Sequence, residues 1–79
     1  SGPRATSFSG DGMYLVGVDI EPGTYRATGD GYWERLKSAA GGFDGILDNE
    51  NVNGKAVVKI ARTDKFFSTA GMGEWTQVR

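Results

Sequence analysis

Glycine interrupts this chain so often that long helices are ruled out. The 79 residues include 13 glycines, and no window of a dozen residues holds an apolar i, i+3, i+4 stripe free of glycine. The short runs between the glycines are rich in valine, tyrosine, threonine and tryptophan, which favour strands. The sequence therefore predicts an all-β fold.

Alternation of apolar and polar side chains places the strands. The predicted strands are residues 13–20, 24–28, 32–38, 55–61, 66–68 and 74–78. In the first of them one face is apolar and consists of Tyr14, Val16, Val18 and Ile20. In residues 55–61 the predicted core face is Ala56, Val58 and Ile60, and the two lysines point to water.

Turn residues separate these runs. Pro22 and Gly23 have the chemistry of a type II turn, and Asn53-Gly54 is a tight-turn dipeptide. Residues 29–31 predict a further turn, and residues 69–73 a glycine-rich loop.

Turn signals about every 8–12 residues fit a small antiparallel β-sandwich or barrel of about six short strands. Residues 10–79 are predicted to be this single β domain. Residues 1–9 are expected to be a flexible leader or a cloning junction.

The composition argues against several classes of function. With no cysteine and no histidine, the chain lacks disulfides, thiolate and imidazole metal ligands, and the usual base of a nucleophilic triad. We therefore expect no enzyme and no cofactor. The 9 basic and 10 acidic residues nearly cancel, which argues against nucleic-acid binding. No apolar run approaches the roughly 18 residues of a membrane span.

Two acidic or amide-rich patterns resemble a catalytic or a metal-binding site, but each has a simpler interpretation. Asp44, Asp48 and Glu50 could supply a carboxylate pair, but a solvated acidic loop is the favoured interpretation. Residues 49–54 resemble the first half of a calcium loop, yet the twelfth position, a glutamate in that motif, is Ile60. An asparagine-rich turn is favoured there, and no metal site is expected.

The aromatic residues are the best functional lead. Alternation places Trp33 on one strand face with Arg35 and Lys37. Exposed tryptophan and arginine anchor interfaces, so this face is the candidate binding site. The competing interpretation is favoured: Trp33 lies in the core while the two cations reach out to water. Trp75 is expected in the core, and only one of Phe66 and Phe67 can point inward.

Several stretches resemble a small domain of actinobacterial secreted proteins and lipoproteins, and of some of their phages. The matching segments are VGVDIEPGTYRATG (16–29), YWERL (32–36), ILDNENVNGKAVVKI (46–60), TDKFFSTAG (63–71) and GEW (73–75). The resemblance covers residues 12–76. It implies an envelope-associated or appended β module without catalytic activity.

One departure from that family pattern stands out. The family reads CYWERL and GCGxW, whereas this chain has Gly31 and Met72 at the two cysteine positions. If the family cysteines pair, the resemblance implies that Gly31 and Met72 lie close together. Loss of both fits a protein that matures in a reducing compartment, such as a cytosolic or phage-encoded member.

Two functions follow from these observations. The first is a non-catalytic binding module of an envelope-associated or secreted bacterial protein, which recognises a protein or a wall polymer. The alternative is a structural or assembly module, such as a phage virion decoration or a self-associating domain, because a small core gains support from oligomerisation.

Overall fold

The computed structural model describes residues 5–37 and 45–78, and confirms the all-β prediction. The described residues form six strands and no helix; the strands are β1 (Ser7–Ser9), β2 (Gly12–Leu15), β3 (Gly23–Leu36), β4 (Ile46–Ile60), β5 (Phe66–Met72) and β6 (Glu74–Gln77). All strand pairs are antiparallel and belong to one sheet.

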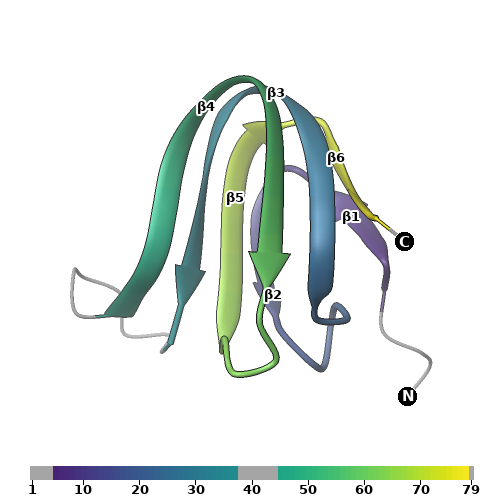
Figure 1. Cartoon of the computed structure of the whole chain (residues 1–79), viewed down its shortest axis with the longest axis vertical. Helices are drawn as coiled ribbons and strands as arrows, with labels where there is room; N and C mark the ends of the chain where they lie inside the picture. The colour runs from purple at the N-terminus through teal and green to yellow at the C-terminus, as the bar shows by residue number, and fades with distance from the viewer. Residues whose placement is uncertain (1–4, 38–44, 79) are drawn as a thin grey trace.

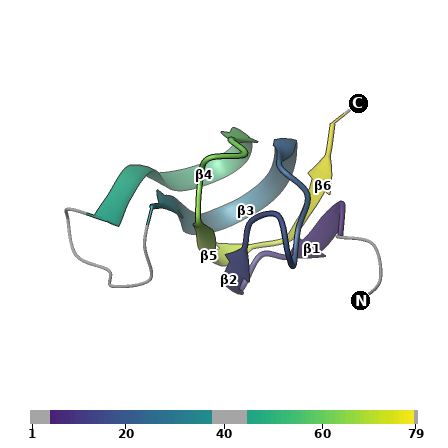
Figure 2. The same ribbon diagram turned by 90° about the horizontal axis from the view of Figure 1, so that it is seen from below.

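The sheet is built around β3, which pairs with three other strands. β4 runs beside it from Gly23↔Ile60 to Leu36↔Ile46. On its other side β3 pairs first with β6 and then with β5. β1 extends the sheet beyond β6, and β2 extends it beyond β5. Figure 1 shows β3 and β4 rising and descending together as one arch, and Figure 2 shows the sheet curled into a half-barrel.

Glycines make the bend of the arch possible. Gly29 lies opposite Gly54 in the β3–β4 register, and both have a positive φ (151° and 113°). A side chain at Gly31 would overlap the carbonyl oxygen of Ala70, and one at Gly10 would overlap that of Met72. Backbones of neighbouring strands therefore approach where the sheet folds over, and only glycine fits.

The core lies inside the curled sheet. Its largest fully buried side chains are Trp75, Tyr25, Phe67, Ile20 and Ile60. Phe67 packs edge-on against Trp75, with ring centroids 5.3 Å apart. Phe8 of β1 adds a third ring, 5.9 Å from Phe67. The predicted inward positions of residues 55–61 are confirmed, as is the core position of Trp75; these buried side chains are Ala56, Val58, Ile60 and Trp75.

Two predicted turns are continuous strand. Residues 29–31 lie within β3, and Asn53-Gly54 lies within β4, opposite Asp30 and Gly29. The glycine signal in these segments marks a bend of paired strands, because each strand keeps its partner through the bend. The predicted loop at 69–73 is likewise wrong for residues 69–72, which complete β5.

The actual turn near the N-terminal end lies earlier than predicted. β2 ends at Leu15, and the backbone N–H groups of Val18 and Asp19 donate to the Leu15 carbonyl oxygen. Val18 is consequently 63% exposed, contrary to the predicted strand over 13–20. Pro22 and Gly23 do not form the turn: Pro22 directly precedes β3, and Gly23 is its first residue.

The expected leader contributes to the sheet. Ser7–Ser9 form β1, which pairs with β6 through Phe8↔Trp75. The Phe8 side chain is buried against the aromatic core. The described part of the domain therefore begins before residue 10.

Candidate functional site

Trp33 does not form an exposed binding face. Its side chain is only 6% exposed and stacks on Phe67, with ring centroids 6.1 Å apart. The favoured interpretation, that Trp33 belongs to the core, is confirmed. Its indole Nε1 is buried without a hydrogen-bond partner among the described residues.

Arg35 is committed to an internal ion pair. Its Nε and Nη2 donate to the two carboxylate oxygens of Asp64 at 2.6 and 2.9 Å, while Asp48 is 3.9 Å away. The Asp64 side chain is 1% exposed and also accepts the backbone N–H of Ala61. The hydrogen bonding that Arg35 donates to the Asp64 carboxylate raises the pKa of Arg35 above its ordinary value. Arg35 therefore joins β3 to the turn between β4 and β5.

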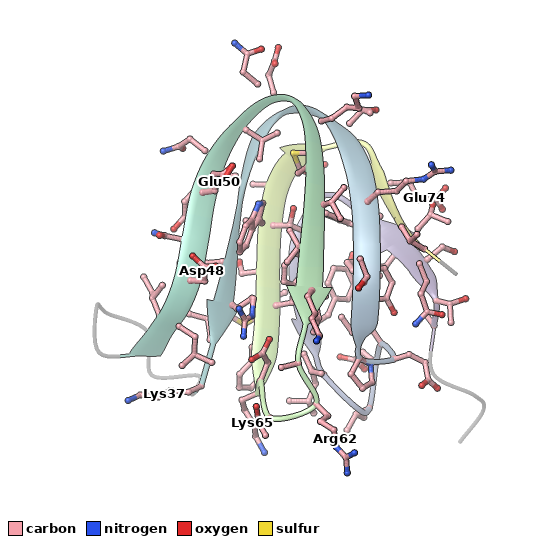
Figure 3. The ribbon with its side chains drawn as sticks, in the orientation of Figure 1. Lys37, Asp48, Glu50, Arg62, Lys65 and Glu74 are labelled. Carbon is pink, nitrogen blue, oxygen red and sulfur yellow. The ribbon has the colours of Figure 1, made fainter. Side chains whose placement is uncertain are left out.

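Lys37 is exposed just beyond the end of β3 and points away from the sheet (Figure 3). The structure thus separates the three residues of the predicted site: Trp33 is in the core, Arg35 is in an ion pair, and Lys37 is exposed and forms no ion pair with another described residue.

The amide- and carboxylate-rich segment is a strand rather than a loop. Asp48 and Glu50 lie on β4 and are exposed, and Figure 3 shows both on the outer arm of the arch. Asn49 donates to the Tyr32 hydroxyl, which donates to Glu34, at 2.9 and 3.0 Å. No group of three or more potential metal ligands occurs in the described segments. Asp44 lies outside the described residues.

A groove opens on the outer face of the sheet, where β6, β3 and β4 lie side by side. The hollow has a volume of about 470 Å³. It is lined by Arg26, Ala27, Thr28, Lys55, Ala56, Val57, Glu74 and Thr76. Strand alternation produces this lining, because the side chains of Ala27 and Ala56 turn into the core while their neighbours turn outward.

The groove combines an apolar surface with charge. Val57 is 68% exposed, the highest value among the exposed large apolar side chains of the described residues. Arg26 and Lys55 are exposed beside it, and neither forms an ion pair or a side-chain hydrogen bond with another described residue. The arrangement can therefore make apolar and charged contacts with a partner without first breaking internal ones.

Sequence reasoning missed this groove although the signal was present. Alternation puts Arg26 and Thr28 on one face of residues 24–28, and it predicts that Lys55 points to water. Their juxtaposition depends on the register of β3 with β4, which pairs Arg26 with Val57 and Thr28 with Lys55. Because a turn was predicted at Asn53-Gly54, the continuous pairing of β3 with β4 could not be predicted.

The two replaced cysteine positions of the resemblance lie in neighbouring strands. Gly31 is packed against Ala70 and Gly71 of β5, directly before Met72. Met72 is buried and pairs with Gly29 of β3. Any side chain at Gly31 would meet the β5 backbone, so this chain is built around the glycine.

Comparison with known protein families identifies the family of this chain. The family model of the Rv1352-like extracellular domain matches residues 6–76. No curated protein and no solved structure matches significantly. The described residues contain no helix of the length and apolarity needed to cross a membrane.

Proposed function

We propose, since this chain belongs to the family of Rv1352-like extracellular domains, that it is a non-catalytic binding module of a secreted or envelope-associated protein. The outer groove is its binding site for a protein or a wall polymer. This family fits the extracellular or envelope location that the resemblance implies. A cytosolic or phage location receives no support from it.

One observation carries this proposal. The groove brings exposed Val57 together with Arg26 and Lys55, whose side chains pair with no other described residue, on the neighbouring strands β3 and β4. Exposed apolar surface that is rimmed by polar groups marks interaction sites. A site on strands also needs little ordering when a partner binds, which favours affinity.

Co-sedimentation with insoluble cell-wall material from an actinobacterium tests the proposal. Thr28→Tyr fills the groove without changing its charge, and tyrosine suits an exposed strand position. Thr63→Tyr, in the exposed turn after β4, is the matched control. Wild type and Thr63→Tyr should pellet with the walls, and Thr28→Tyr should stay in the supernatant. Equal pelleting of all three proteins would refute the groove as the site.

The second candidate function is assembly. β4 is the longest strand, with 15 residues, and among the described strands it pairs only with β3. Its other edge therefore presents backbone donors and acceptors that a further strand can use. Phage virion decoration would be one form of such assembly, and self-association another.

A further inference from the structure

The groove has a local charge opposite in sign to that of the whole chain. Arg26 and Lys55 contribute two positive charges, and Glu74 is the single acidic side chain among the described lining residues. The chain as a whole has a formal net charge of −1. A local excess of positive charge in a hollow attracts anions and raises their local concentration.

The two cations are placed to act on one group. Arg26 pairs with Val57 and Thr28 pairs with Lys55, so Arg26 and Lys55 are diagonal neighbours on the same outer face. Diagonal positions in an antiparallel pair lie roughly 7–8 Å apart, within reach of long side chains. The guanidinium of Arg26 can hold a carboxylate or phosphate with two parallel hydrogen bonds, while the ammonium of Lys55 adds a second charge.

The lining argues against a neutral sugar as the principal ligand. None of the described residues that line the groove is aromatic, so no ring is present for a sugar to stack on. The threonine hydroxyls of Thr28 and Thr76 add hydrogen-bonding groups beside the cations. This combination suits an acidic group whose remaining oxygens accept from hydroxyls.

We infer that the groove binds a carboxylate or phosphate group of an extended polymer, held between Arg26 and Lys55. The inference rests on the proposed binding function and adds the chemical class of the ligand. Glu74, at the rim and pointing away from the arch (Figure 3), opposes anion binding and sets a limit on affinity.

Fluorescence anisotropy with three labelled probes tests the inference: oligoglutamate, linear polyphosphate and uncharged dextran. The intact domain should bind at least one acidic probe, more weakly as salt rises, and should not bind dextran. Arg26→Gln and Lys55→Gln should each weaken binding about tenfold or more. Glu74→Gln should strengthen it by a few-fold at most, as for an exposed charge.

Lys65→Gln is the matched control, because Lys65 is an exposed cation at the lower rim of the molecule, after the turn that follows β4 (Figure 3). Its affinity should equal that of wild type. Circular dichroism of each variant should match the wild-type spectrum.

Three results would overturn the inference: Lys65→Gln weakens binding as much as Arg26→Gln, dextran binds as well as the acidic probes, or no acidic probe binds. If Thr28→Tyr still abolishes wall binding in any of these cases, the groove remains the site and only the ligand class is wrong. If Thr28→Tyr leaves wall binding intact, the proposed function itself fails.

Discussion

At the scale of single residues, Arg35 of β3 forms an ion pair with the buried carboxylate of Asp64. Arg35 lies on the same strand face as Trp33, and its Nε and Nη2 donate to a carboxylate that lies 29 residues further along the chain. The role of Asp64 could not be predicted from the sequence, because the residues around a turn do not show which distant cation its carboxylate will contact. This ion pair links the turn after β4 to strand β3.

Removing one partner of this pair should destabilise the fold. Arg35→Ala leaves the 1%-exposed Asp64 carboxylate without its cation, and we expect the free energy of unfolding to fall by about 3 kcal/mol. Lys37→Ala, two residues further on and exposed, should change it by less than about 0.5 kcal/mol. Urea unfolding followed by circular dichroism measures both. An unchanged midpoint for Arg35→Ala would contradict the assigned role.

Tyr25 should make stability depend on alkaline pH. Burial, and then the charge of Glu21, raise the pKa of Tyr25 above 10.0, and its hydroxyl donates to the Glu21 carbonyl oxygen at 2.6 Å. The folded state therefore holds this proton more tightly than the unfolded chain. The stability it contributes is complete below pH 10.0 and is lost as pH rises further.

Comparison with Tyr25→Phe isolates this effect. The free energy of unfolding of wild type should fall more steeply above pH 10.0 than that of the phenylalanine variant. Parallel curves for the two proteins would show that Tyr25 keeps an ordinary pKa.

At the scale of elements, the sequence predicted which side chains of a strand point inward better than it predicted where each strand begins and ends. The inward side chains of residues 55–61 followed from alternation and are confirmed. The strand lengths could not be predicted from alternation. Glycine often marks a turn, but in this chain it allows β3 and β4 to bend while they remain paired. The groove could not be predicted without the register of these two strands, although Lys55 was correctly predicted to point to water.

The bend should tolerate no side chain at Gly31. Gly31→Ala brings a methyl group onto the Ala70 carbonyl oxygen, and we expect a loss of about 1–3 kcal/mol in the free energy of unfolding. Asp30→Ala, at the exposed position beside it, should have little effect. Thermal unfolding of the two variants provides the comparison. Equal melting temperatures would mean that the strands do not approach as closely as described.

At the scale of the whole molecule, the curled sheet is open, and the outer edge of the long strand β4 pairs with no other described strand. If the domain assembles through β4, sedimentation velocity should show larger species as the protein concentration rises. The β4 amides that point away from β3, every second residue, should then exchange more slowly with solvent. A monomer at all concentrations, with unchanged exchange in β4, would refute this assembly mode.

The chain belongs to a family of extracellular domains, and the proposed binding site is the outer groove on β3, β4 and β6. The most direct test is to map amide chemical shifts while adding the acidic probe to the labelled domain. We predict that the perturbed amides cluster at residues 26–28, 55–57 and 74–76 and that Thr28→Tyr abolishes the changes. Perturbations centred instead on Trp33 and on strands β2 and β5 would contradict the account.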